Sequence, residues 1–170
     1  MENLQSLLSQ TGKIVRKGKE QDAASGEAFN IFRITKIERA EVNTHSAMIA
    51  ELLNPDGSHG KGTQFLAQLL TNMGVIYNCS LKDAFVRKEQ TFSDGKGRVD
   101  IVIHLRDHLI LIENKVDAGD GEEQLFNYAG IGGRSHKTAH LWYLTKQGSG
   151  AAEHSHKNVD YRRMSYREDI

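Results

Sequence analysis

GRVDIVI at residues 97–103 and LILIENK at residues 109–115 are the two segments that determine the architecture of this chain. Each is a run of branched apolar residues of strand length, and the short polar stretch between them predicts an antiparallel hairpin. Three charges interrupt the runs, Asp100, Glu113 and Lys115. Charged side chains on a buried strand are costly unless they are paired or bind a metal, so these residues are the first candidates for a functional site.

The expected register of this hairpin brings the two acids together. With residues 106–107 at the bend, Asp100 lies directly across from Glu113, and Lys115 shares the face of Glu113 because alternate strand residues point the same way. Like charges in directly opposed positions repel, and a shared divalent cation removes that conflict. Carboxylates suit Mg²⁺ or Mn²⁺, and a lysine beside them can neutralise developing charge. The alternative is a surface hairpin with solvated charges, which the apolar run at 109–112 disfavours because it makes both strand faces apolar.

Composition bounds the protein class. The chain has 170 residues, the size of one domain with a real core. Lys+Arg and Asp+Glu are 22 each, which argues against holding nucleic acid by overall charge and leaves a local basic groove open. The single Cys79 excludes an internal disulfide and fits a cytoplasmic location. No apolar run approaches the length of a membrane span, so we expect no membrane association.

Periodicity and turn residues predict an α/β sandwich with a mixed sheet. The expected order is a helix over 29–53, a helix over 65–73 ending at Gly74, a strand over 84–92, strands over 98–105 and 109–116, a helix that starts with a capping box at 120–123 and stops at 130–133, a strand over 140–145 and a loop over 146–150. Residues 1–28 read as a short helix and a solvated linker, with a basic arm on a nucleic-acid backbone as the alternative.

Further candidate residues lie on helices and in a loop. Gln124 and Tyr128 are four apart, so both could reach a phosphate or steady the lysine; otherwise they are a helix-surface pair. Glu41 and His45, one turn apart, could add an acid and an imidazole to the cation site, although such a pair is usually solvated. His59, in a glycine-rich loop, could approach substrate, although loop histidines are commonly just solvated.

These residues resemble the PD-(D/E)XK nuclease superfamily. The segments that carry the resemblance are GRVD at 97–100, ENK at 113–115 and QLFNY at 124–128. They look closest to the branch that shares a Q-x-x-x-Y helix with RecB-type and lambda-exonuclease-type nucleases. FNIF at 29–32, Glu41 with His45-Ser46, LLNP at 52–55, SHG at 58–60 and YLT at 143–145 resemble a bacterial family of that superfamily. The similarity covers residues 29–170, and Val99 stands where the motif's name has Pro.

The resemblance implies a restriction-endonuclease-like domain over 29–170 with an α-β-β-β-α-β core and Mg²⁺-dependent phosphodiester hydrolysis, on DNA in preference to RNA. By position, Asp100, Glu113, the carbonyl of Asn114 and the helix acid Glu41 would bind the metal. Lys115 would be the catalytic lysine, and Gln124 and Tyr128 would support the substrate side. Proteins of this kind usually continue into further helices, so we expect the chain, which stops at Ile170, to lack a C-terminal helical region.

The function that we expect is that of a DNA nuclease in bacterial defence, mobile elements or repair. Two alternative functions remain open. One is a non-catalytic module that binds nucleic acid or protein on the same fold, although such a module has no need to keep two acids and a lysine on buried strands. The other is a nuclease acting on RNA. Whether the protein forms a homodimer also stays open.

Overall fold

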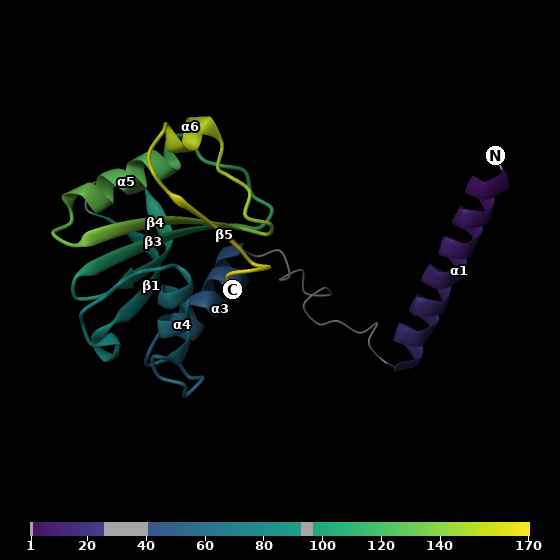
Figure 1. The fold of residues 1–170 in the computed structure, drawn as a ribbon, viewed down its shortest axis with the longest axis horizontal. Helices are drawn as coiled ribbons and strands as arrows, with labels where there is room; N and C mark the ends of the chain where they lie inside the picture. Colours follow the sequence, from purple (N-terminus) through teal and green to yellow (C-terminus); the bar gives the residue numbers. More distant parts are fainter. Residues whose placement is uncertain (1, 26–40, 93–96) are drawn as a thin grey trace. The chain divides into compact units, whose positions relative to one another are not determined.

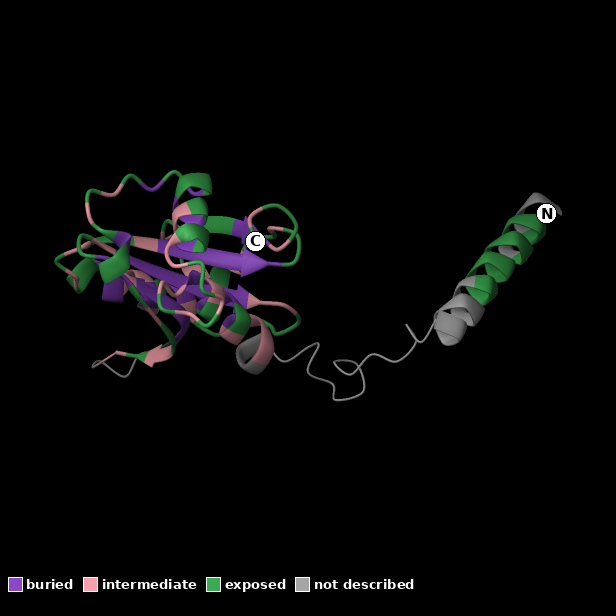
Figure 2. Cartoon of the chain, turned by 90° about the horizontal axis from the view of Figure 1, so that it is seen from below, coloured by how far each residue is buried: buried purple, intermediate pink, exposed green. Residues whose placement is uncertain are grey.

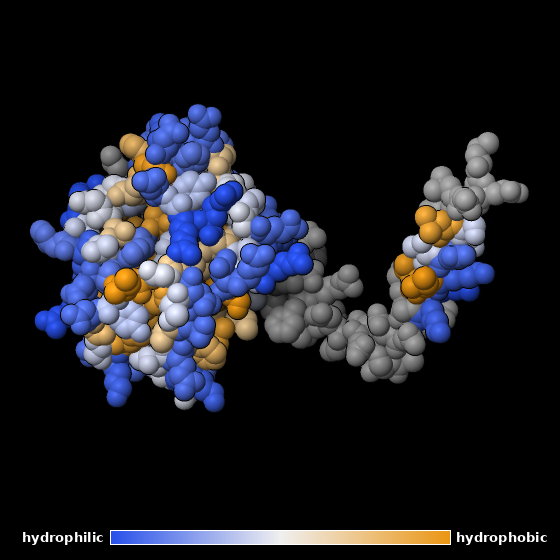
Figure 3. Space-filling view, in the orientation of Figure 1, coloured by the Kyte–Doolittle hydropathy of each residue, from blue (hydrophilic) through white to orange (hydrophobic). Residues whose placement is uncertain are grey.

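The computed structural model describes residues 2–25, 41–92 and 97–170. It divides the chain into two compact units, Met1–Glu38 and Arg39–Ile170. The domain boundary that we propose between residues 28 and 29 lies outside the described residues. In the first unit, helix α1 (Glu2–Ser25) is much longer than the short helix expected there. Its apolar and charged side chains gather on different sides (Figure 3), and Leu7, Ile14 and Val15 are exposed.

The second unit is built on a five-stranded sheet with the order β1-β2-β3-β4-β5. The strands are β1 (Phe85–Thr91), β2 (Arg98–His104), β3 (His108–Lys115), β4 (Thr138–Thr145) and β5 (Arg162–Ser165). β1, β2 and β3 pair antiparallel, whereas β3, β4 and β5 pair parallel. The helical segments are η2 (Glu41–Ser46), α3 (Ala47–Leu53), α4 (Gln64–Asn72), η3 (Leu81–Asp83), α5 (Gln124–Arg134) and α6 (Glu153–His156). The expected α/β class and α-β-β-β-α-β order are confirmed.

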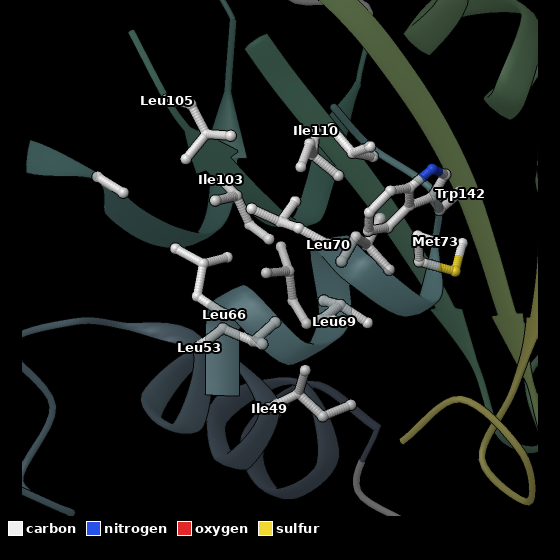
Figure 4. Close-up of a cluster of buried hydrophobic side chains, with 14 of the residues drawn as sticks. Ile49, Leu53, Leu66, Leu69, Leu70, Met73, Ile103, Leu105, Ile110 and Trp142 are labelled. Carbon is white, nitrogen blue, oxygen red and sulfur yellow. The ribbon is translucent and has the colours of Figure 1, made fainter. Parts of the chain in front are cut away.

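Helices cover both faces of this sheet (Figure 1). Alternate residues of the central strands therefore enter two separate cores. On one face α3 and α4 pack against Ile103, Ile110 and Trp142 (Figure 4). On the other, Val102 and Leu111 pack against α5. Because both faces of β2 and β3 are covered, these strands are almost wholly buried (Figure 2), and any charge on them sits in a low-dielectric setting.

The register of the β2–β3 hairpin is the predicted one. Its paired residues run from His104 with Leu109 to Ile101 with Ile112. Leu105 closes the bend by donating its backbone N–H to the His108 carbonyl at 3.0 Å. Extending this register by one residue places Asp100 across from Glu113, as the bend at 106–107 requires.

Helix α5 departs from the prediction at both ends. The capping box at 120–123 is wrong: α5 begins at Gln124, and the residue before it, Glu123, has φ 52° and makes no side-chain cap hydrogen bond. Asp120 instead accepts hydrogen bonds from the Tyr143 hydroxyl at 2.6 Å and from the Ala152 N–H at 2.7 Å. The helix also runs through the glycines at 130–133. A Cβ at Gly132 would come within 2.7 Å of the Ala139 Cβ, so this glycine permits close helix–strand packing.

The remaining differences concern short elements. Of the helix expected over 29–53, residues 29–40 lie outside the described residues, and the described part is η2 followed by α3. Gly74 has φ 62° directly after α4 and its C-cap, which confirms the predicted stop. Strand β5 and helix α6 were not predicted. In the part of the chain that the structure describes, no helix combines the length and apolar character that crossing a bilayer requires.

Candidate active site

A pocket of about 430 Å³ opens where β2 begins and β3 ends. Parallel strands β3 and β4 put their carboxyl ends at this edge, the usual place for a ligand site in an open α/β sheet. Six predicted residues line it: Asp100, Glu113, Asn114, Lys115, Gln124 and Tyr128. The other lining residues are Gly97, Arg98, Gly121, Glu122 and Asn127. The structure thus brings the strand acids and the helix pair to one cavity.

Asp100 is fixed by the neighbouring strand. Its side chain is buried, and its Oδ2 accepts the backbone N–H of Asn114 at 2.8 Å. The regular β2–β3 pairing ends one residue earlier, at Ile101 with Ile112. The carboxylate of Asp100 therefore accepts a backbone hydrogen bond just where the regular strand pairing ends. This hydrogen bond holds the carboxylate beside Glu113.

Glu113 is 2% exposed, and its two oxygens have different surroundings. Oε1 accepts Lys115 Nζ at 2.8 Å and Gln124 Nε2 at 2.7 Å. Oε2 is buried and has no hydrogen-bond partner among the described residues. A buried carboxylate oxygen without a partner costs free energy, and coordination of a cation would satisfy it.

The electrostatics of the pocket favour the same interpretation. Burial and, to a lesser extent, nearby Asp100 together raise the pKa of Glu113 to about 7, against the opposing effect of Lys115. Burial alone would lower the pKa of Lys115, but Glu113 and Asp100 outweigh it, so that pKa is raised. Two carboxylates in one buried place cannot both ionise cheaply. A divalent cation between them would remove the repulsion that raises the pKa of Glu113.

The Q-x-x-x-Y helix joins this cluster through hydrogen bonds. Gln124 Nε2 also donates to the Tyr128 hydroxyl at 3.1 Å, and that hydroxyl donates to the Arg98 carbonyl at 2.6 Å. Burial and nearby Glu113 raise the pKa of Tyr128, so it remains a donor. A Cβ on Gly97, whose φ is 152°, would lie 2.8 Å from Tyr128 Cε1. Glycine at 97 therefore leaves room for the tyrosine ring.

Asn114 offers its backbone to the pocket. Its side-chain amide donates to Ser46 Oγ at 3.0 Å and accepts from the Tyr166 hydroxyl at 2.8 Å. With the amide engaged by these two partners, the backbone carbonyl is what Asn114 can contribute as a ligand. These hydrogen bonds explain why an asparagine suits this position: the residue is buried, and both ends of its amide are satisfied.

Three other candidates remain: the structure does not describe the side chain of Glu41, and it places His45 and His59 away from this pocket. Glu41 begins η2, which packs against β2 and β3, but its side chain lies outside the described residues. The ring of His45 packs edge-on against that of Tyr166, with centroids 5.8 Å apart. His59 bonds within its own loop: Nε2 lies 3.1 Å from the Asn54 carbonyl, and Nδ1 accepts the Lys61 N–H at 3.0 Å. Neither histidine lines the pocket.

Sequence reasoning did not assign Asp120, Tyr143 or Asn127 to the site. Tyr143 pairs with Glu113 in the β3–β4 register, and its hydroxyl holds Asp120, which fixes the segment leading into α5. No local pattern reports that contact, because the partners are 23 residues apart. Asn127 lines the pocket three residues after Gln124, so helical spacing could have identified it.

The residues present fit a hard divalent cation. In the described ranges, no group of three or more His, Cys, Asp or Glu side chains converges in a metal-binding arrangement. The carboxylates of Asp100 and Glu113, the latter with its unpartnered Oε2, and the backbone carbonyl of Asn114 nonetheless form an all-oxygen donor set. Mg²⁺ is commonly held by one or two carboxylates, with water and substrate phosphate oxygens completing the shell.

Comparison with known proteins agrees with this geometry. The family model of the PD-(D/E)XK nuclease superfamily matches residues 29–170. The chain therefore belongs to the PD-(D/E)XK nuclease superfamily, whose members generally use divalent metals, and its core has the restriction-endonuclease-like fold. No curated protein and no solved structure matches the chain. The narrower likeness to the RecB and lambda-exonuclease branch stays a prediction.

Proposed function

We propose that this protein is a divalent-metal-dependent nuclease that hydrolyses phosphodiester bonds of DNA in the Asp100–Glu113 pocket. The observation that carries the proposal is the buried, unpartnered Oε2 of Glu113, on a strand residue directly across from Asp100. Lys115 Nζ sits on the other oxygen of the same carboxylate. Acid, acid and lysine in one open pocket suit a phosphate group that approaches a cation.

Each residue has a role in this proposal. Asp100, Glu113, the Asn114 carbonyl and Glu41 would hold Mg²⁺ or Mn²⁺. When bound, the cation supplies Lewis-acid stabilisation of phosphate charge and lowers the pKa of water. Lys115 places an ammonium beside the reacting phosphate, where it neutralises charge that develops in the transition state.

The helix residues act through Glu113. Gln124 holds Oε1 of Glu113, and Tyr128 anchors Gln124 to the backbone of β2 through the Arg98 carbonyl. Partners of this kind orient metal ligands and tune their affinity. The proposal names DNA because the Q-x-x-x-Y helix resembles that of the RecB and lambda-exonuclease types, and it places the protein in the cytoplasm, which the single Cys79 favours.

A cleavage panel tests the proposal. Single-stranded, double-stranded and branched DNA, with matched RNA, are incubated with the protein in Mg²⁺, Mn²⁺ or chelator. We expect metal-dependent cleavage of DNA and a loss of about a hundredfold or more in Asp100→Asn, Glu113→Gln and Lys115→Met. Asp107→Asn, an exposed acid at the far end of the same hairpin, is the matched control and keeps full activity.

Three outcomes would contradict the proposal. If every substrate stays intact with either metal while the protein still binds oligonucleotides, the non-catalytic module is the better description. If RNA alone is cleaved, the assignment to DNA is wrong. If the Asp100→Asn and Glu113→Gln variants cleave as well as Asp107→Asn does, the pocket is not the active site.

A further inference from the structure

A second pocket, of about 380 Å³, opens on the other side of Lys115. Its walls are the segment 115–118 and the loop 145–149, so Lys115 lines both this pocket and the one that holds Asp100 and Glu113. Lys115 and Thr145 are paired at the carboxyl ends of parallel strands β3 and β4. The two pockets are therefore adjoining parts of one crevice at the edge of the sheet where ligands of open α/β folds bind.

The loop that walls this pocket is held in one conformation. Gly148 has φ 71°, a left-handed value that favours glycine, and a Cβ there would meet the Ser165 Cβ at 3.4 Å. The Ser149 hydroxyl donates to Thr145 Oγ1 at 3.2 Å, and the Tyr166 N–H donates to the Thr145 carbonyl at 3.1 Å. Hydroxyl groups and the adjacent lysine are thus presented to the pocket by a braced turn.

The charge in this pocket is available to an anion. Lys146 Nζ lies 2.5 Å from Asp117 Oδ1, and the two side chains are 54% and 43% exposed. An ion pair this exposed is worth no more than about 1 kcal/mol, so a phosphate can take the place of Asp117 on the lysine. The cavity volume falls in the range of small-ligand sites, about 300–1,000 Å³, which accommodates a nucleotide.

We propose that the pocket between 115–118 and 145–149 binds the nucleotide that adjoins the scissile phosphate, with Lys146 Nζ on that nucleotide's phosphate. The inference rests on the proposed nuclease function and adds a substrate subsite to it. Lys115 then stands between two successive phosphates, one at the acids and one at Lys146. Because the subsite contacts backbone charge, it binds substrates irrespective of base sequence.

Steady-state cleavage at several salt concentrations tests the subsite. Lys146→Ala should raise KM about tenfold, because it removes one charged hydrogen bond to phosphate. The slope of log(kcat/KM) against log[salt] should shrink by about 0.7–0.9, the contribution of one phosphate contact. Asp117→Asn should lower KM, since it removes the group that competes for Lys146. Lys82→Ala, an exposed lysine of η3, removes the same charge elsewhere and should change neither quantity.

A neutral phosphate identifies the contact. A methylphosphonate beside the scissile phosphate should lower the kcat/KM of wild type and of Lys82→Ala. It should lower the kcat/KM of Lys146→Ala very little further, because the contact with that phosphate is already absent in this variant. If Lys146→Ala keeps the salt slope of Lys82→Ala, or loses as much as wild type on the neutral substrate, the subsite is overturned while the nuclease function stands. A wild-type protein that cleaves no nucleic acid overturns both. Thermal denaturation confirms that each variant is folded.

Discussion

Gln124 on helix α5 donates its Nε2 to Oε1 of Glu113 on strand β3 at 2.7 Å. The same amide accepts the Gly121 N–H through Oε1 at 3.2 Å and donates to Tyr128. Every polar atom of the Gln124 side chain is therefore engaged, and its orientation is fixed. As a result Oε1 of Glu113 is occupied by protein donors, and Oε2 is the oxygen left for a ligand.

Replacing this amide should weaken metal binding while the fold is kept. In Gln124→Leu the carboxylate of Glu113 loses an orienting partner, and we expect Mn²⁺ affinity to fall about 10- to 100-fold. Isothermal titration calorimetry measures the affinity, and circular dichroism reports the fold. Gln68→Leu, on the exposed face of α4, is the control. Equal Mn²⁺ affinity in the two variants would contradict a positioning role for Gln124.

The glycine that precedes β2 should be intolerant of a side chain. In Gly97→Ala the new Cβ would lie 2.8 Å from Tyr128 Cε1, so the ring must shift or the backbone must strain. We expect a loss of about 1–3 kcal/mol in the free energy of unfolding, measured in urea. Gly133→Ala, within α5, is the opposite case, because a Cβ at this position would have open space around it. We expect this variant to leave the free energy of unfolding unchanged or to raise it by up to about 1 kcal/mol. Similar losses in both variants would refute the steric explanation.

Much of the fold could be predicted because local patterns carried the needed information. The branched apolar runs at 97–103 and 109–115 specified strands, and a bend at 106–107 fixed their register to the residue. Strand β5 was missed because it has four residues, two of them the exposed Arg162 and Arg163. Its place in the sheet depends on pairing with β4, which no local pattern reports.

The site was predictable only in part, for a similar reason. Two-residue alternation and helical spacing selected Glu113 with Lys115, and Gln124 with Tyr128. The local sequence predicted that Asp120 caps a helix. Its carboxylate instead accepts hydrogen bonds from Tyr143 and Ala152, which lie 23 and 32 residues away in the sequence. The loop 145–149 has no motif, and its importance follows from the pairing of Lys115 with Thr145.

Removing the hydrogen bond between Tyr166 and the side chain of Asn114 should have a small, measurable effect on stability and on metal affinity. Tyr166→Phe removes the donor to Asn114 Oδ1 and leaves a buried amide oxygen without it. We expect a loss of about 1 kcal/mol in unfolding free energy, with a modest loss of Mn²⁺ affinity as the Asn114 backbone becomes less restrained. Tyr77→Phe, on the same scaffold, is the matched removal of a tyrosine hydroxyl. A Tyr166→Phe variant as stable as Tyr77→Phe would show that the hydrogen bond contributes nothing.

The contribution of His104 to the stability of the protein should fall in mild acid. Burial, with nearby Lys137 and Arg87, lowers the pKa of His104 to about 4. Between pH 6.5 and 4 the His104 ring therefore binds more protons in the unfolded chain than in the folded one, so the contribution of His104 to the free energy of unfolding falls as the pH falls. After discount for the half-exposed ring, this amounts to no more than about 2 kcal/mol.

The variant His104→Phe isolates this contribution. It keeps a ring to stack on Phe85 and removes the titrating group. Urea denaturation at pH 7, 5.5 and 4.5 should show that the free energy of unfolding of wild type falls relative to that of His104→Phe as the pH falls, because the contribution of Glu113 is common to both proteins. Parallel curves for the two proteins would mean that His104 has an ordinary pKa.

The most direct test of a cation between Asp100 and Glu113 is calorimetric titration of the intact protein with Mn²⁺. We expect one binding event in wild type, retained in the Asp107→Asn control and abolished in both Asp100→Asn and Glu113→Gln, with all four proteins folded by circular dichroism. Undiminished Mn²⁺ binding in the two pocket variants, or no binding in wild type, would contradict a metal site at these carboxylates.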